Sequence, residues 1–163
     1  MTTTTTLVPI PQRLDFDALA PTFSRAVSSL DAAATAELDR AGVDLVLREL
    51  VRLRASQLNG CAYCVDMHSK AAVQHGATAQ RLHAVAIWED SPFFTAQERA
   101  ALRLTEAITR LAETHVPQQV VDDALDVFTE AETAAIISLV LTINLWNGIG
   151  VTTRCWEPVL DND

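Results

Sequence analysis

Apolar residues recur at helical spacing along most of the chain, in segments separated by short polar breaks. Over residues 16–38 the spacing is intermittent and breaks near Pro21, which predicts one or two helices. Over 44–58 apolar residues occupy nearly all sides, as in a helix that is packed on most faces. Asn59-Gly60 ends this pattern, so we expect a new helix over 61–74 that opens at the first cysteine.

The second half of the chain carries clear signals for helix starts. A helix is predicted over 78–88, with a threonine as its N-terminal cap. Two further starts, at 95–98 and 129–132, have the capping-box spacing Thr-x-x-Glu. They predict a long amphipathic helix that ends near Glu113 and an apolar helix over 133–147.

The composition agrees with packed helices, because 49% of the 163 residues are hydrophobic and only five are glycine. We therefore predict an all-α fold in one domain. Residues 1–12 are expected to form an extended N-terminal arm, since a threonine tract with Pro9 and Pro11 cannot make a helix. Residues 13–163 are expected to form a single all-α domain with its core over about 40–150.

Charge and cysteine content narrow the functional classes. The net charge of −9 repels phosphate backbones and anionic headgroups, so neither nucleic acid nor a membrane is an expected partner. Three cysteines, two of them only three residues apart, suit a cytosolic redox or metal pair better than a secreted disulfide scaffold. The apolar run over 134–143 is shorter than the ~20 residues of a membrane span. We expect a cytoplasmic protein.

The candidate chemistry lies in Cys61-Ala-Tyr-Cys64 and in His68, which follows one helical turn later. Thiols at a helix start meet free backbone N–H groups and the positive end of the helix dipole, which can lower their pKa from about 8.5 toward neutrality. The spacing places both sulfurs and the imidazole on one face. An imidazole titrates near neutral pH and can serve as base and then as acid. The pattern indicates thiol redox chemistry.

A single acid, Glu49, interrupts the apolar and basic helix that precedes the cysteines. It has two interpretations. It is either a partly buried carboxylate that orients His68 or a water near Cys64, or a solvated acid paired with Arg52 at i,i+3.

Together, Glu49, the Ser-Gln-x-Asn-Gly-Cys-x-Tyr-Cys segment at 56–64 and His68 resemble the active-site motif of the alkylhydroperoxidase D-like branch of the carboxymuconolactone decarboxylase superfamily. The resemblance covers roughly residues 40–150. It implies a compact helical fold whose CxxC motif lies at a helix N-terminus, assembled into homo-trimers or homo-hexamers. Where some family members carry a histidine between the cysteines this chain has Tyr63, a possible relay residue or substrate contact.

The resemblance also implies a thiol-dependent peroxidase that reduces organic or hydrogen peroxide. Cys64 would attack the peroxide, and Cys61 would then close a Cys61–Cys64 disulfide, with Glu49 and His68 as proton relay. No bound cofactor is expected. An external dithiol, such as a lipoyl or thioredoxin-type donor protein, would restore the pair.

Three other functions are open, of which the first two use the same residues and the third is disfavoured by the cysteine pair. The first is a disulfide reductase or carrier that passes electrons to a partner protein. The second is a zinc site on Cys61, Cys64, His68 and one further ligand, for which the chain offers no second ligand pair. The third is the lyase chemistry that gives the superfamily its name.

Two further features have no assigned role in these readings. Cys155 stands alone and is expected to be a small buried or tail residue. Five aromatic residues form either an access channel for an organic substrate or, as is more common at such spacing, part of the core. They are Trp88, Phe93, Phe94, Trp146 and Trp156.

Overall fold

The computed structural model describes residues 8–160, and within this range the chain is helical with no β-strand. The expected all-α fold is thereby confirmed. The helices are α1 (Phe16–Leu19), α2 (Pro21–Ala41), α3 (Leu45–Asn59), α4 (Ala62–Gln74), α5 (Ala79–Ala84), the 3₁₀ segment η1 (Val85–Asp90), α6 (Ala96–Thr109), α7 (Leu111–Thr114), α8 (Gln118–Leu125) and α9 (Glu130–Thr153).

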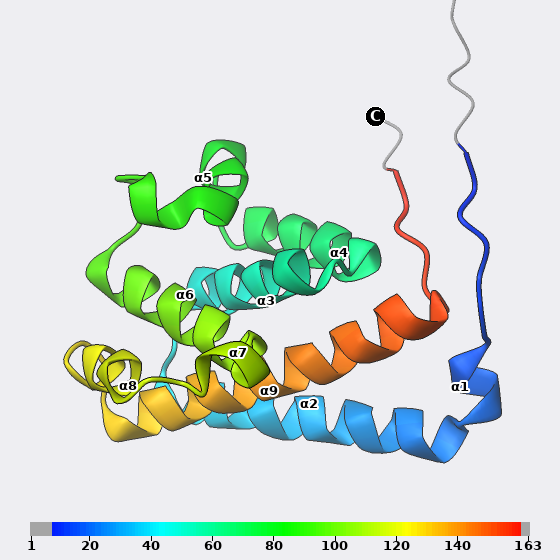
Figure 1. The fold of residues 1–163 in the computed structure, drawn as a ribbon, viewed down its shortest axis with the longest axis horizontal. Coiled ribbons are helices and arrows are strands. Elements are labelled where there is room, and N and C mark those ends of the chain that lie inside the picture. The colour runs from blue at the N-terminus through cyan, green and yellow to red at the C-terminus, as the bar shows by residue number, and fades with distance from the viewer. Residues whose placement is uncertain (1–7, 161–163) are drawn as a thin grey trace, which may run out of the picture.

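The expected N-terminal arm is described only in part. Residues 1–7 lie outside the described residues, and residues 8–15 have no regular secondary structure. The arm is fastened where it meets the helices, because the backbone N–H groups of Arg13 and Leu14 both donate to the carbonyl of Thr153, at 2.9 and 3.0 Å. The segment just before α1 and the end of α9 therefore lie side by side, as Figure 1 shows.

Helix α3 is the centre of the arrangement. It packs against α4, α6 and α9, while α2 runs along α9 on the other side (Figure 1). Two hydrophobic clusters meet at α3, with Leu47 and Val51 in one and Leu50 and Leu53 in the other. Each fully buried leucine contributes about 1.5–3 kcal/mol, so α3 is held from several directions. The predicted packing of this helix on most of its faces is confirmed.

Both predicted capping boxes are present. The side chains of Thr95 and Thr129 each accept the backbone N–H of the residue three positions on, and the carboxylate of that glutamate accepts the backbone N–H of the threonine. The predicted break near Pro21 is also present, since α1 ends at Leu19 and Pro21 begins α2.

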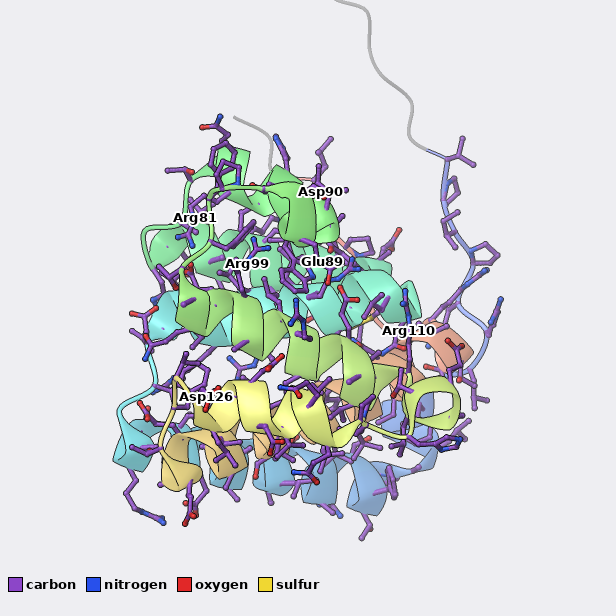
Figure 2. All side chains as sticks on the ribbon, turned by 60° about the vertical axis from the view of Figure 1, so that its left-hand side comes forward. Arg81, Glu89, Asp90, Arg99, Arg110 and Asp126 are labelled. Carbon is purple, nitrogen blue, oxygen red and sulfur yellow. A yellow bond between two sulfur atoms is a disulfide. The ribbon has the colours of Figure 1, made fainter. Side chains whose placement is uncertain are left out.

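The helix predicted over 78–88 is wrong in its second half, where α5 gives way to η1. Ile87 has non-helical angles, φ −126° and ψ 33°. Tertiary contacts explain the change, because Arg99 of α6 donates to the carbonyls of Trp88, Glu89 and Ser91 at 2.8–3.1 Å (Figure 2). A helix that ended at Trp88 would leave its last carbonyls without partners, and the Arg99 side chain supplies donors at this end instead.

Two other helix ends differ from the predictions. The helix expected to reach Glu113 ends at Thr109, because Arg110 leaves helical geometry at φ −98° and ψ 38° before α7 begins. The last helix extends beyond the predicted 147 to Thr153.

By length and composition alone, α9 is long and apolar enough to cross a membrane. The apolar run over 134–143, which is too short for a span by itself, lies within this longer helix. A core helix passes the same test. Asn144 does not end the helix, because its amide donates to the Thr109 hydroxyl at 3.0 Å and to the Val140 carbonyl at 2.8 Å. Residues Ile136, Leu139 and Val140 are buried against the rest of the fold, in keeping with a core helix.

The turn between α3 and α4 places the cysteine motif. Gly60 adopts the left-handed conformation, with φ 71° and ψ 30°, and its N–H donates to the Gln57 carbonyl. The N–H of Cys61 donates to the Ser56 carbonyl at 3.0 Å, which closes the end of α3. The next residue begins α4, so the first cysteine caps that helix.

Substituting Gly60→Ala and Gly42→Ala tests this turn. Both glycines are left-handed, at φ 71° and 73°, and an added Cβ meets nothing within 4 Å at either position. Only backbone strain should therefore matter, and each variant should lose about 1 kcal/mol of unfolding free energy in urea denaturation. An unchanged unfolding free energy in either variant would contradict the left-handed cap at that position.

Candidate active site

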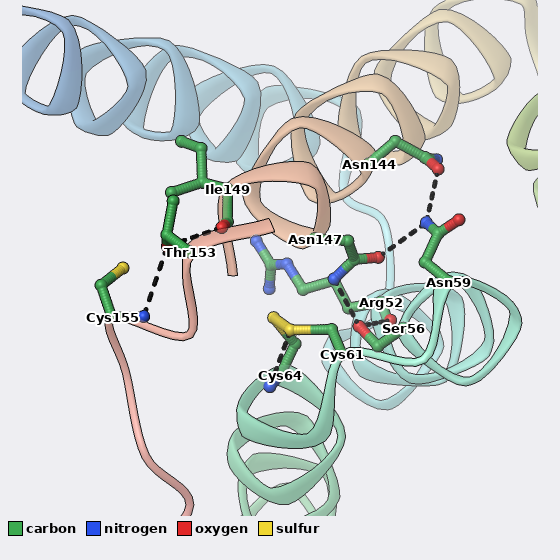
Figure 3. Close-up of a disulfide and its surroundings, with 10 residues drawn as sticks. All are labelled: Arg52, Ser56, Asn59, Cys61, Cys64, Asn144, Asn147, Ile149, Thr153 and Cys155. Carbon is green, nitrogen blue, oxygen red and sulfur yellow. Dashed lines mark hydrogen bonds between the residues drawn. A yellow bond between two sulfur atoms is a disulfide. The ribbon is translucent and has the colours of Figure 1, made fainter. Parts of the chain in front are cut away.

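Cys61 and Cys64 are joined by a disulfide at the N-terminus of α4 (Figure 3). Cys61 is the cap residue, and its sulfur accepts the backbone N–H of Cys64 at 3.4 Å. Both residues are only 2% exposed. The pair thus lies at the end of the helix where free N–H groups and the helix dipole favour a negatively charged sulfur in the reduced state.

His68 lies one turn further along α4 and is buried. Its Nδ1 is 2.8 Å from Oε2 of Glu49, which comes from α3. Because an ionised carboxylate only accepts hydrogen bonds, we assign the proton to Nδ1. Nε2 is then an acceptor, and among the described residues it is buried without any hydrogen-bond partner. The imidazole has one nitrogen fixed and the other free to take a proton.

Glu49 has both of the partners that the two sequence interpretations offered. Arg52 donates from Nη1 to Oε1 at 2.6 Å, while His68 occupies Oε2. The acid is not solvated, however, since Glu49 is only 5% exposed. Burial raises the pKa of Glu49, but the hydrogen bond from His68 and the charge of Arg52 outweigh it, so the pKa lies below its ordinary value. Glu49 is therefore ionised at neutral pH.

A polar network joins the C-terminal end of α3 to α9 beside the disulfide (Figure 3). The amide of Asn147 donates to the Ser56 hydroxyl at 3.0 Å, and Ser56 donates to the Arg52 carbonyl at 2.7 Å. The amide of Asn59 donates to Asn147 at 3.0 Å and to Asn144 at 2.8 Å. Asn147 is fully buried, so these bonds fix α9 against the helix that precedes the cysteines.

Cys64 and His68 open into one cavity of about 550 Å³, which we call the Cys64 cavity. Its other lining residues are Asp17, Ser24, Arg25, Ser28, Asp31, Arg52, Tyr63, Met67, Ile143, Trp146 and Trp156. One wall is aromatic, because the ring of Trp156 lies 5.7 Å from that of Tyr63 and 5.5 Å from that of Trp146. Helix α2 contributes four polar lining residues, Ser24, Arg25, Ser28 and Asp31.

The C-terminal segment fixes this aromatic wall. Trp156 lies beyond the end of α9, and its indole N–H donates to Asp17 at 2.9 Å. Lys70 of α4 donates to the Val159 carbonyl at 2.6 Å, which holds the segment along α4. Sequence spacing could not show that a residue after the last helix lies over the cysteine motif.

Of the five aromatic residues considered for an access channel, only Trp146 and Trp156 line the Cys64 cavity. The channel interpretation is wrong for Trp88 and Phe94, which are buried in the hydrophobic cluster on the other side of α3. Phe93 is 41% exposed and does not line the cavity either.

Cys61 opens into a second cavity, of about 670 Å³, which we call the Cys61 cavity. Its walls come from the N-terminal segment, the start of α4 and the end of α9 with the residues after it. Cys155, a half-buried free thiol, lines it. Tyr63 lines both cavities. Sequence reasoning had attached no role to Cys155 and did not place the N-terminal segment near the cysteines.

Metal binding finds no further support in the geometry. No group of three or more His, Cys, Asp and Glu side chains within residues 8–160 is placed to hold a metal ion. His75 and His83, two of the histidines outside the motif, lie at the C-cap of α4 and on the exposed side of α5.

Several known proteins are similar to this chain in sequence or in structure. The chain is 33% identical to the uncharacterized protein YdfG of Bacillus subtilis over 112 residues, which cover 69% of this chain and 76% of YdfG. It is 33% identical to a protein of unknown function from Agrobacterium tumefaciens, for which a role as the antioxidant defence protein AhpD has been suggested. The TM-score is 0.85, over 92% of this chain and 100% of that one.

A third likeness concerns the fold alone. The alkylhydroperoxidase AhpD core of an uncharacterized peroxidase-related protein from Ralstonia eutropha has a TM-score of 0.75 at 20% identity, over 88% of this chain and 74% of that one.

The carboxymuconolactone decarboxylase family model matches residues 21–107, more than half of the chain, and this range contains Glu49, both motif cysteines and His68. The chain belongs to the carboxymuconolactone decarboxylase family, as an AhpD-like member.

Proposed function

We propose that the protein is a thiol-dependent peroxidase that reduces organic hydroperoxides through a Cys61–Cys64 dithiol/disulfide cycle. The observation that carries the proposal is the free Nε2 of His68. This nitrogen is buried without a partner, on an imidazole fixed by ionised Glu49, and His68 lines the same cavity as Cys64. The imidazole that would accept the proton and the sulfur that would react therefore line the same cavity.

The first half of the cycle oxidises Cys64. His68 accepts the thiol proton, and the Cys64 thiolate attacks the terminal peroxide oxygen. The O–O bond breaks, an S–O bond forms, and the alkoxide leaves. The proton held on His68 passes to this alkoxide, so the products are an alcohol and a sulfenic acid on Cys64.

The second half closes the disulfide. The Cys61 thiolate attacks the sulfur of the sulfenic acid, the S–O bond breaks, and hydroxide leaves and takes up a proton to become water. An external dithiol then returns two electrons and two protons to the pair. The reactants are thus one hydroperoxide and one dithiol, and the products are one alcohol, one water and one disulfide.

Glu49 acts through His68 and is a positioning residue. Its carboxylate holds Nδ1–H, which leaves Nε2 as the nitrogen that exchanges protons. Its charge also stabilises the imidazolium that forms when His68 accepts the thiol proton. Arg52 keeps the buried carboxylate ionised and oriented while this happens.

The Cys64 cavity supports a small organic substrate over a protein disulfide. Cys64 is 2% exposed and lies at an aromatic wall formed by Tyr63, Trp146 and Trp156, which suits an organic hydroperoxide better than the surface of a folded protein. We propose that the disulfide-carrier activity is secondary, and that the lyase activity is absent.

A comparison of substrates separates peroxidase from carrier. Turnover of cumene hydroperoxide should be faster than exchange with the disulfides of insulin, and faster exchange with insulin would favour the carrier.

The remaining expectations follow from this proposal. The reductant is a dithiol donor, and the need for a reducing thiol pool places the activity in the cytoplasm. Exposed apolar residues on α1, α2 and α9, such as Leu19, Phe23 and Leu141, support assembly into a homo-trimer or homo-hexamer.

Replacing either cysteine tests the cycle. Cys61→Ser and Cys64→Ser should both abolish steady-state turnover of cumene hydroperoxide with dithiothreitol as donor, because each removes one half of the disulfide. Only Cys61→Ser should give a sulfenic acid that dimedone traps, detected by mass spectrometry. Full turnover in both variants would contradict the mechanism, while dimedone labelling of Cys64→Ser alone would reverse the two sulfur roles.

Replacing Glu49 tests the positioning role. Glu49→Gln should lower kcat by about 10²-fold or more with little change in KM, since it removes charge next to His68 and leaves the cavity walls intact. The matched control is Glu106→Gln, a carboxylate that accepts from Arg54 and Trp88 at 2.7 Å and does not line the cavity. Equal losses of kcat in the two variants would show a general structural effect instead.

The lowered pKa of Glu49 predicts a dependence of stability on pH. Above its ordinary value of 4.5, Glu49 is ionised in both the folded and unfolded chain, and its stabilisation is fully present. As pH falls through the lower folded-state pKa, that stabilisation is lost. The unfolding free energy should therefore drop below pH 4.5 more steeply in the parent than in Glu49→Gln, by up to about 1.4 kcal/mol per pH unit. Equal slopes in urea denaturation would contradict the ionised, paired state.

A further inference from the structure

The disulfide separates two cavities, and each sulfur-bearing residue borders only one of them. Cys64 lines the Cys64 cavity together with His68, and Cys61 does not line it. Cys61 lines the Cys61 cavity, and Cys64 does not. The proposed peroxide reaction takes place in the first cavity, which leaves the second without a function.

The Cys61 cavity is formed where the two ends of the described chain meet (Figure 1). Val8, Pro9 and Ile10 supply one side, and the residues after α9 supply the other. Val8 and Ile10 are 83% and 62% exposed, so the cavity opens to solvent along the N-terminal segment. A molecule from outside can therefore approach Cys61 without passing the Cys64 cavity.

Gly150 of α9 brings the helix close to the sulfur on this side. A Cβ added to Gly150 would lie 3.0 Å from Cys61 Sγ and 3.4 Å from the ring of Trp156. Any side chain there would crowd the sulfur and the ring. The glycine keeps Cys61 at the wall of the second cavity without a side chain over it.

Thiol–disulfide exchange distinguishes the two sulfurs. A thiolate attacks one sulfur from the side opposite the bond that breaks, and the other sulfur leaves as a thiolate. Attack on Cys61 expels Cys64, which lies in the first turn of α4 and is therefore stabilised by the helix dipole. Cys64, which shares a cavity with His68, is therefore the better leaving sulfur. Its release as a thiolate leaves it in the form that attacks the next peroxide.

The charged residues of the Cys61 cavity suit an anionic nucleophile. They are Arg13, Arg154 and Glu157, two cations against one acid, on a chain whose net charge is −9. A thiolate is the reacting form of the donor, and cations along its path favour it.

We propose that the Cys61 cavity is the entrance for the reducing dithiol, so that peroxide and reductant reach the disulfide from two different sides; this rests on the proposed function. A donor thiolate attacks Cys61 Sγ, the Cys61–Cys64 bond breaks, and Cys64 leaves as a thiolate. The donor's second thiol then attacks the donor sulfur of the mixed disulfide, which releases Cys61 and closes the donor disulfide. The two donor protons pass to the released sulfurs or to solvent.

A trapping experiment locates the attacked sulfur. The oxidised protein in a Cys155→Ser background, which removes the internal thiol of this cavity, is treated with glutathione and quenched at early times with iodoacetamide. Fragment-ion mass spectrometry should place glutathione on Cys61 and the alkyl group on Cys64. Glutathione on Cys64 would overturn the proposal. Loss of reduction in Cys155→Ser would also overturn it, because the electrons would then pass through Cys155.

Two cavity-filling variants separate the entrances. Val151→Trp fills the Cys61 cavity and Ser28→Trp fills the Cys64 cavity, each at an exposed lining residue. Val151→Trp should slow reduction of the disulfide by dithiothreitol on the order of tenfold, and more than it slows oxidation of the dithiol by cumene hydroperoxide. Ser28→Trp should slow oxidation of the dithiol by cumene hydroperoxide more than it slows reduction of the disulfide by dithiothreitol.

Equal slowing of both half-reactions by Val151→Trp, or of neither, would overturn the proposal. So would a changed subunit count in light scattering with unchanged reduction, because a second copy of the chain would then cover this face. The reduction step needs no peroxide, so its result is readable even if the peroxidase function fails.

Discussion

The buried carboxylate of Glu49 is the constraint on which the site depends. A charge with 5% exposure is tolerated only with partners, and leaving such a group unpaired typically costs about 3–5 kcal/mol. Arg52 supplies one partner from the same helix, and His68 supplies the other from the next helix. Because Glu49 binds the proton-bearing nitrogen of His68, the opposite nitrogen is left without a partner, on a ring that lines the same cavity as Cys64. The need of the buried Glu49 carboxylate for hydrogen-bond partners thus sets the orientation of the imidazole.

The cysteines reach this acid–imidazole pair through the turn at Gly60. Helix α3 holds Glu49 and ends at Asn59, the chain turns at Gly60, and α4 then follows its cap residue Cys61 and brings His68 back toward α3. The bond from Asn147 to Ser56 fixes the end of α3 against α9. Small errors in this turn would displace the sulfurs from His68, so the packing of three helices determines the chemistry at one helix N-terminus.

Local signals in the sequence predicted much of the fold and of the site. Thr-x-x-Glu marked two helix starts, and Asn59-Gly60 marked the start at Cys61, because caps and left-handed turns depend on nearby residues. Glu49 and His68 were named from spacing and family resemblance, and the structure brings them within 2.8 Å. Their catalytic roles remain predictions.

Contacts between distant parts of the chain could not be predicted from the sequence patterns. The predicted helix gives way to a 3₁₀ segment where Arg99 of α6 binds the carbonyl of Trp88 and lies over its ring, and no local propensity encodes these contacts. The rings of Trp156 and Tyr63 lie 5.7 Å apart, although the two residues are 93 positions apart in the sequence. The Cys61 cavity needs both ends of the described chain, so its existence follows only from the tertiary fold.

The central claim is that the start of α4 and the Glu49-fixed imidazole together make Cys64 an acidic, reactive thiol. The most direct measurement is a pH titration of thiolate ultraviolet absorbance in reduced Cys61→Ser/Cys155→Ser, in which Cys64 is the one remaining thiol, compared with the same protein carrying His68→Ala. We expect Cys64 to ionise well below the ordinary thiol pKa of about 8.5 and to return toward it when His68 is removed. Ordinary thiol acidity in both proteins would contradict the account.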